Sequence, residues 1–316
     1  MFQLYKKRNF NELVGDTFSF FKLYGKHYFR NYLIVNGGFV LILLILAFFL
    51  FKIFYEGTLS GLSNGGPGNQ FDSFIAENFL LFMSFGGLSV LLLVIISLIS
   101  YLYPVVYLDL LSRKKDFDTA EITQAVKSKI GKVLLFFILS MFTAMPLIAI
   151  AFMLSFALVF ILIGIPLILL LIPAAGSWLS LSFYNYISTD DDYFASLSKA
   201  FQMMKSKFWP IIGSTFVMYL IVQAIVGTIS MVPYIIGVAS VFTTLENPDA
   251  INPDSSSPFS FFVIMMLLVF VLSVVLNFFM QNLLLINNGV IYYSIREESE
   301  NNTPKNDIDL IGTQSE

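Results

Sequence analysis

The 316-residue chain contains no cysteine and a single histidine, His27. Without cysteine there are no disulfides, thiolate metal ligands or cysteine nucleophiles, and one imidazole excludes a relay that needs two. Charge is also scarce: 12% of the residues are charged, against about 25% in soluble proteins, while 57% are hydrophobic. These proportions predict that lipid is the main solvent of the folded chain.

Long windows without charge mark the expected membrane crossings, because a helix needs about 20 apolar residues to cross roughly 30 Å of hydrocarbon. They predict six transmembrane spans, at about residues 32–53, 78–108, 133–157, 163–187, 208–233 and 258–286. The stretch between Lys132 and Asp190 holds no charge, so we expect it to reverse near residues 164–166, where glycine and proline occur. A full hairpin and a pair of re-entrant helices both remain open. Pro146 and Pro173 lie inside these spans, and we expect each to kink its helix.

The basic residues predict the orientation of the chain. Every lysine and arginine except Lys52 lies before the first span, between spans two and three, between spans four and five, or in the tail. The opposite loops, around residues 56–77 and 244–258, carry acidic residues and no base. Under the positive-inside rule, both termini are therefore expected in the cytoplasm.

An amphipathic segment precedes the first, third and fifth spans, at about residues 9–31, 118–131 and 190–206. Apolar residues recur there at three- and four-residue steps, as expected of helices that lie in the membrane interface. The expected apolar stripes are Phe10, Leu13, Val14, Phe18, Phe21, Tyr24 and Tyr28; then Ile122, Val126 and Ile130; then Tyr193, Leu197, Ala200, Phe201, Met204 and Phe208. Asp118 and Glu121 have the spacing of a capping box.

The predicted fold is therefore an all-α polytopic membrane protein, with six transmembrane helices arranged as three repeats of amphipathic surface helix plus transmembrane pair. Residues 1–297 form a single integral membrane domain, and residues 298–316 form a disordered cytoplasmic tail. Two roles remain open for the surface helices: they gather positive charge for topology, or they form a docking or lipid-sensing collar. Basic residues near the cytoplasmic leaflet attract anionic headgroups by about 1 kcal/mol each. The candidates for headgroup contact are Lys22, Lys26, Arg30, Lys127, Lys129, Lys205 and Lys207.

Candidate chemistry inside the membrane is limited to uncharged amides. No ionisable residue is expected deep in a span, and Asp109 lies at a helix end where it can pair with Arg113. The amides considered for a polar cavity or for helix packing are Asn277, Gln281, Asn288, Gln223 and Asn36. Amides that hydrogen-bond neighbouring helices are the commoner case. We identify no catalytic residue, metal site or cofactor site.

The segments RNFNELVGDTFSFFKLYGKHYFRNY and ASLSKAFQMMKSKFWPIIG, together with the six spans, resemble the membrane domain associated with bacterial glycerophosphodiester phosphodiesterases. The resemblance covers roughly residues 5–297. It implies a bacterial cytoplasmic (inner) membrane as the location. The soluble hydrolase domain of that family, with its histidine pair and metal-binding carboxylates, has no counterpart here, so the resemblance implies the membrane domain alone.

Two hypotheses follow for function. The first is a non-catalytic scaffold or accessory subunit that docks a membrane-protein partner, a second copy of itself or anionic lipid through the basic surface helices. The alternative is a permease or lipid-handling protein with a polar path along the sixth span. An enzyme and a nucleic-acid partner are not expected.

Overall fold

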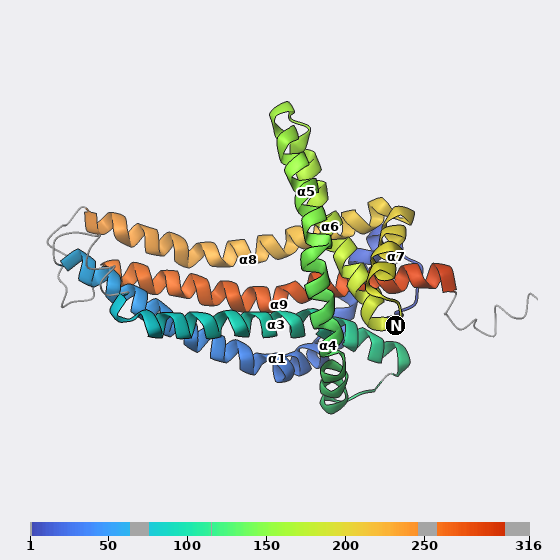
Figure 1. Ribbon diagram of the computed structural model, residues 1–316, viewed down its shortest axis with the longest axis horizontal. Helices are drawn as coiled ribbons and strands as arrows, with labels where there is room; N and C mark the ends of the chain where they lie inside the picture. Colours follow the sequence, from blue (N-terminus) through green and yellow to red (C-terminus); the bar gives the residue numbers. More distant parts are fainter. Residues whose placement is uncertain (1, 64–75, 115, 246–257, 301–316) are drawn as a thin grey trace, which may run out of the picture. The chain divides into compact units, whose positions relative to one another are not determined.

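The computed structural model describes residues 2–63, 76–114, 116–245 and 258–300 (Figure 1). The described part of the chain is helical and contains no strand. Its elements are α1 (Phe10–Ser63), α3 (Phe79–Arg113), α4 (Thr119–Phe142), α5 (Ala144–Ala157), the 3₁₀ turn η1 (Leu158–Ile161), α6 (Gly164–Ser188), α7 (Tyr193–Ser206), α8 (Phe208–Leu245) and α9 (Pro258–Glu300). Most of the two acidic loops, and residues 301–316 of the predicted tail, lie outside the described residues.

Six helical segments are long and apolar enough to cross a membrane. They are Phe10–Phe54, Phe79–Arg113, Thr119–Ile161, Gly164–Ser188, Phe208–Ala239 and Ile264–Glu300. The all-helical class and the number of long apolar helices are thus confirmed, and together they are the architecture of a multi-pass membrane protein.

The helices run through most of the boundaries expected between surface helices and spans. Helix α1 continues past Asn31 as one element, and α4 continues past Gly131. Only α7 and α8 are separate helices, with the break at Lys207. At the other end of the chain, α9 continues through residues 298–300.

The uncharged stretch folds as a helical hairpin in which α5 packs against α6. The chain reverses through η1 and Leu162, whose φ of 64° is left-handed, just before the expected turn. A Cβ at Gly164 would lie 2.2 Å from the carbonyl oxygen of Ser155. Glycine is required at this position because the two arms approach so closely.

The two prolines of this region act differently. The helix is interrupted at Thr143, which separates α4 from α5 three residues before Pro146. Proline cannot donate a helical hydrogen bond and its ring crowds the preceding turn, which accounts for this interruption. The expected kink stays a prediction. Pro173 lies inside α6, which continues through it as a single helix.

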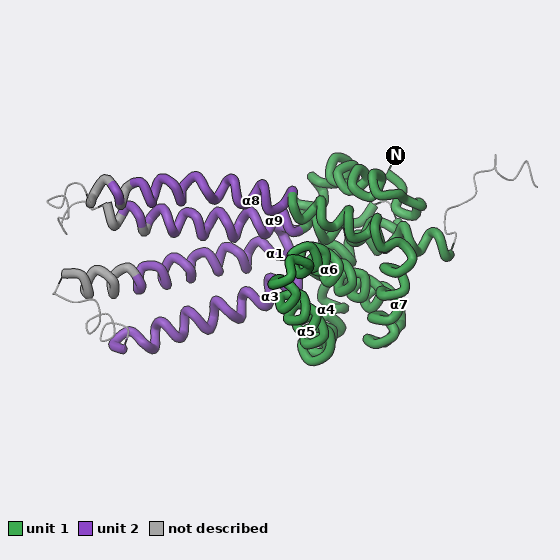
Figure 2. The backbone as a smooth tube through the Cα atoms, turned by 90° about the horizontal axis from the view of Figure 1, so that it is seen from above, with its two compact units in different colours: residues 1–31, 101–220, 282–316 green, residues 32–100, 221–281 purple. Residues whose placement is uncertain are grey.

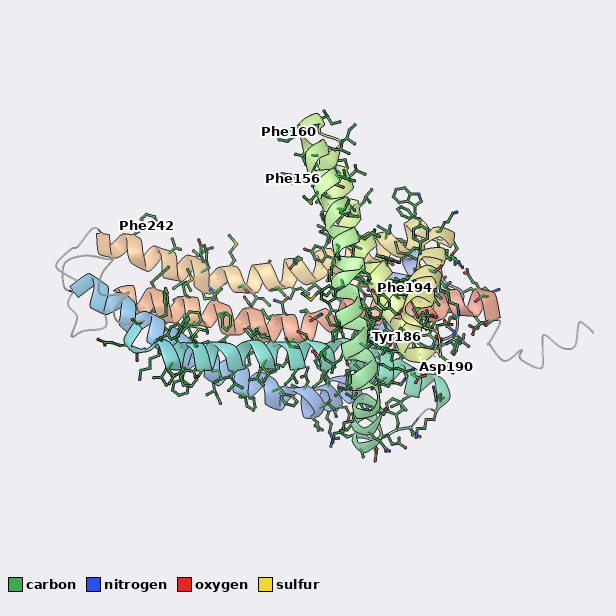
Figure 3. All side chains as sticks on the ribbon, viewed as in Figure 1. Phe156, Phe160, Tyr186, Asp190, Phe194 and Phe242 are labelled. Carbon is green, nitrogen blue, oxygen red and sulfur yellow. The ribbon has the colours of Figure 1, made fainter. Side chains whose placement is uncertain are left out.

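Large apolar side chains cover the outside of the hairpin. Phe156 and Phe160 are 67% and 89% exposed, and both point away from the ribbon near its tip (Figure 3). Leu154 and Met153 of the same helix are also exposed. Such a continuous apolar surface is unusual on a soluble monomer and is what a lipid environment favours.

The contacts of the chain cluster into two compact units, which Figure 2 shows in different colours, whereas one domain was expected over residues 1–297. Unit 1 comprises Met1–Asn31, Tyr101–Leu220 and Asn282–Glu316, and unit 2 comprises Tyr32–Ser100 and Ile221–Gln281. The long helices α1, α3, α8 and α9 therefore each contribute one part to unit 1 and another to unit 2.

The buried stripe of the first part of α1 differs from the expected one. Phe10 and Phe18 are exposed, and the buried residues of this part of α1 are Leu13, Thr17, Phe20, Gly25, Tyr28 and Asn31. On α7, Phe201 is likewise exposed, while Ser196 is buried. The predicted stripes were wrong at these positions because an apolar side chain is stable against lipid as well as against protein. Buried Thr17 and Asn31 both have hydrogen-bond partners.

Candidate functional site

Unit 2 contains a cavity of about 310 Å³ between α1, α3 and α9. We call it the amide cavity. Its polar lining residues are Ser97, Ser100, Ser273, Asn277 and Gln281, and its apolar lining residues are Val40, Leu43, Leu93, Ile96, Phe270, Val274 and Phe278. On α9 the polar residues recur every four positions, which places them on one face of the helix.

Two of the amides singled out from the sequence, Asn277 and Gln281, meet at this cavity. Asn277 Nδ2 donates to the carbonyl oxygen of Ser273 in its own helix, at 2.8 Å. Gln281 makes no hydrogen bond with any residue that the structure describes. Neither amide therefore links α9 to another described helix, which is what the packing interpretation required.

Asn36, by contrast, connects two helices. It is fully buried, and its Nδ2 donates to Ser100 Oγ at 2.8 Å and to the carbonyl oxygen of Ile96 at 3.3 Å. The hydroxyl of Tyr32 also lies 2.8 Å from Ser100 Oγ. Asn36 Oδ1 has no partner among the described residues. This network fixes α1 to α3 beside the amide cavity, since Ile96 and Ser100 also line that cavity.

The remaining amides lie elsewhere. Gln223 is exposed on α8 and does not line the amide cavity. Asn288 belongs to unit 1, where it is buried and donates to the carbonyl oxygen of Leu284 at 3.0 Å. Its neighbour Asn287 links α9 to α1 through Thr17 Oγ1, at 3.1 Å. The structure thus divides the predicted polar set between a cavity and helix packing.

The predicted headgroup-binding residues also divide into two groups. Five of them are exposed and form no ion pair within the described part of the chain: Lys22, Lys26, Arg30, Lys127 and Lys205. Lys129 instead pairs with Asp109 at 3.3 Å, and Lys207 pairs with Glu298. Asp109 also pairs with Arg113 at 3.1 Å, as the sequence predicts.

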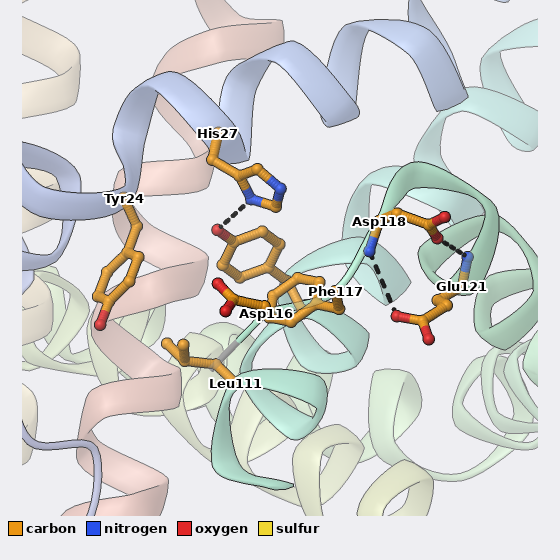
Figure 4. A pocket seen from close by; sticks show the side chains of 8 residues that line it. Tyr24, His27, Leu111, Asp116, Phe117, Asp118 and Glu121 are labelled. Atoms are coloured by element: carbon orange, nitrogen blue, oxygen red, sulfur yellow. Dashed lines mark hydrogen bonds between the residues drawn. The ribbon is translucent and has the colours of Figure 1, made fainter. Parts of the chain in front are cut away.

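Unit 1 contains a second, larger cavity of about 670 Å³, which the sequence analysis did not identify (Figure 4). We call it the aromatic cavity. Its lining residues are Tyr24 and His27 of α1, Tyr107 and Leu111 of α3, and Asp116, Phe117, Asp118 and Glu121 around the start of α4. The predicted capping box is confirmed here: the Glu121 backbone N–H donates to Asp118 Oδ1 at 2.8 Å, and the Asp118 N–H donates to Glu121 Oε2 at 3.3 Å.

His27 is hydrogen-bonded to Asn31 of its own helix and to Tyr107 of α3. Asn31 Nδ2 donates to the carbonyl oxygen of His27 at 2.8 Å, so this atom is the amide nitrogen. The same nitrogen lies 3.1 Å from His27 Nε2. The other ring nitrogen, Nδ1, lies 2.9 Å from the hydroxyl oxygen of Tyr107.

The N-terminal segment is held by Arg8, one of the basic residues that precede the first span. Its side chain is fully buried and donates to Asp16 Oδ2 at 2.8 Å and to the carbonyl oxygens of Leu4 and Lys6 at 2.9 and 3.0 Å. Burial lowers the pKa of Arg8, and the neighbouring Asp16 carboxylate opposes that shift. No pattern in the sequence distinguishes this arginine from its basic neighbours.

Comparison of the chain with models of protein families, with curated proteins and with solved structures finds no match in any of the three. The resemblance to the phosphodiesterase-associated membrane domain stays a prediction. Within the described residues, no group of three or more histidine, aspartate or glutamate side chains is placed to hold a metal ion.

Proposed function

We propose that this chain is a lipid-handling protein of a bacterial cytoplasmic membrane, which binds an amphipathic molecule in the amide cavity. The observation that carries the proposal is the composition of this cavity, which is lined by hydroxyl and amide side chains together with apolar ones. Its volume of about 310 Å³ lies at the lower end of the range of roughly 300–1,000 Å³ for small-molecule sites.

The energetics of polar groups in a membrane support this assignment. An amide or hydroxyl without a partner in hydrocarbon costs several kcal/mol. Gln281 has no hydrogen-bond partner among the described residues. A headgroup or another polar moiety at this position would satisfy the amide, while Leu43, Leu93 and Phe270 would contact the apolar part of the ligand.

Native mass spectrometry of the protein purified in a mild detergent tests the proposal. We expect a bound lipid-sized species on the wild type and its loss in the double variant Asn277→Leu/Gln281→Leu. Gln223→Leu is the matched control, because it removes an exposed amide of unit 2 that does not line the cavity. A wild type that is empty in several detergents, or a double variant that retains the ligand, would refute the proposal.

A second candidate function is supported by a separate observation. The five unpaired basic residues suit a scaffold that docks anionic lipid or a protein partner, at about 1 kcal/mol for each base near an anionic surface. We expect Lys22→Gln/Lys26→Gln/Arg30→Gln to reduce co-purifying anionic lipid or a stoichiometric partner. Lys129→Gln serves as a comparison, because its ammonium already pairs with Asp109. Equal recovery from the triple variant and the wild type would exclude this function.

The proposal includes an arrangement and an orientation. Both termini are cytoplasmic, as the positive-inside rule predicts, and the chain comprises three repeats of amphipathic helix and transmembrane pair. The separate α7 before α8, and the capped start of α4, support the second and third repeats. Cysteine-accessibility labelling tests the orientation cleanly because the chain has no native cysteine. The proposed role is binding, without catalysis.

A further inference from the structure

We propose that the aromatic cavity of unit 1 binds an organic ammonium ion, either a free amine or the amine headgroup of a lipid. The site is separate from the amide cavity, and the inference does not depend on the function proposed for that cavity. It rests on the aromatic rings, the balance of charge and the hydrogen bonding of the lining residues.

Three aromatic rings of the lining pack directly against one another at the border of the cavity. The ring centroids of Tyr107 and Phe117 are 5.0 Å apart, and His27 lies 5.4 Å from Phe117 and 5.8 Å from Tyr107. Tyr24 contributes a further ring to the lining from α1 (Figure 4). The faces of phenyl and phenol rings carry partial negative charge and attract cations. A cation in the cavity would contact the ring surfaces that border it.

Two of the three carboxylates of the lining have no ion-pair partner among the described residues. Asp118 accepts the Glu121 backbone N–H at the start of α4, and Glu121 pairs with Lys114 at 2.5 Å. Asp116 has no hydrogen bond or ion pair with any described residue. Figure 4 shows its carboxylate between Tyr24 and Phe117. An ammonium ion in the cavity would neutralise this carboxylate while it contacts the rings.

Both ring nitrogens of His27 have hydrogen-bond partners: Nε2 lies 3.1 Å from Asn31 Nδ2, and Nδ1 lies 2.9 Å from the hydroxyl oxygen of Tyr107. That hydroxyl oxygen can also accept from the N–H of a primary ammonium, a contact that a quaternary ammonium does not make. The site thus presents a carboxylate, a hydroxyl and aromatic faces, and its three acidic residues disfavour an anion.

Isothermal titration calorimetry of the full chain in a neutral detergent tests this inference, with choline as the probe. Its neutral carbon isostere, 3,3-dimethylbutan-1-ol, has nearly the same shape without the charge. We expect choline to bind at least tenfold more tightly than the isostere. Asp116→Asn should weaken choline binding at least tenfold, and Phe117→Leu about threefold or more. Asp190→Asn, which removes an exposed carboxylate outside the cavity, should leave the affinity unchanged.

The source of the ammonium group is distinguished in nanodiscs. If the site takes a lipid headgroup, phosphatidylethanolamine nanodiscs should weaken choline binding relative to phosphatidylglycerol nanodiscs, whereas equal affinities identify a free amine. Equal binding of choline and its isostere by the wild type would overturn the inference, and so would an unchanged affinity of Asp116→Asn. The comparison of the two probes uses only the wild type, so it decides the question even if a variant fails to fold. Loss of lipid from the amide cavity leaves this result unaffected.

Discussion

Replacement of Gly289 by alanine tests the packing of unit 1. In this unit α9 passes so close to α3 and α6 that a Cβ at Gly289 would lie 2.3 Å from Leu108 Cδ1 and 2.6 Å from the hydroxyl oxygen of Tyr184. That hydroxyl is buried and donates to the carbonyl oxygen of Leu285 at 2.9 Å. A methyl group cannot fit unless the tyrosine ring moves, and its movement would break the hydrogen bond.

The expected cost follows from three contributions. Overpacking a well-packed core costs about 1–3 kcal/mol, and a buried hydroxyl left without its partner costs about 1–3 kcal/mol. In the opposite direction, replacing glycine by alanine inside a helix stabilises the helix by up to about 1 kcal/mol. We therefore expect Gly289→Ala to lower the free energy of unfolding by about 1–6 kcal/mol.

Gly131→Ala is the matched control, because it makes the same substitution on α4 of unit 1, where a Cβ meets nothing within 4 Å. This variant should be as stable as the wild type or more stable by up to about 1 kcal/mol. The assay is the temperature at which the detergent-solubilised protein loses its monodisperse peak in size-exclusion chromatography. If Gly289→Ala keeps its monodisperse peak to the same temperature as Gly131→Ala, the conclusion that α9 passes close to α3 and α6 at Gly289 is wrong.

Two further variants probe polar contacts of unit 1. Hydrogen bonds from Lys199 at 2.6 Å and from Asn185 at 2.7 Å lower the pKa of Asp191. The ionised carboxylate therefore stabilises the folded state at pH values above the pKa of an unfolded aspartate, about 3.9. This stabilisation disappears as the pH falls through the lower pKa that Asp191 has in the folded state. Asp191→Asn should therefore be less stable than the wild type at pH 6, with a difference that shrinks towards pH 3; a constant difference would contradict the assigned pair. Arg8→Met should lower the free energy of unfolding by about 2–3 kcal/mol, because it leaves the carbonyl oxygens that bind the guanidinium without a donor. Lys7→Met, at the exposed neighbouring residue, is the control and should change thermal stability little.

The broad fold could be predicted from the sequence because the relevant signals are local. A window without charge predicts a helix that can cross a membrane, since an isolated charge in hydrocarbon is costly. Asp118 and Glu121 could be assigned to a capping box because both bonds form within one turn of helix. The break before Pro146 was equally local, since proline disrupts its own preceding turn.

The choice of buried faces could not be predicted in the same way. On α1 the apolar stripe included Phe18, which is exposed, and missed Thr17, which is buried. Apolar residues are stable both in a protein core and against lipid, so hydrophobic periodicity does not separate the two surfaces. Whether a threonine or asparagine is buried depends on a hydrogen-bond partner that is distant in sequence, as Thr17 and Asn287 are from each other.

The candidate sites show the same division. The sequence by itself determined that the chain is helical, with six long apolar helices, and that amides supply the polar chemistry of its sixth span. The tertiary structure placed Asn277 and Gln281 at a cavity, assigned Asn36 to packing between α1 and α3, and buried Asn288 with a hydrogen bond inside its own helix. It also brought His27, Tyr107 and Asp116 to one aromatic cavity. The physical reason is range: span hydrophobicity and capping act within a segment, whereas a cavity is formed by side chains from several helices.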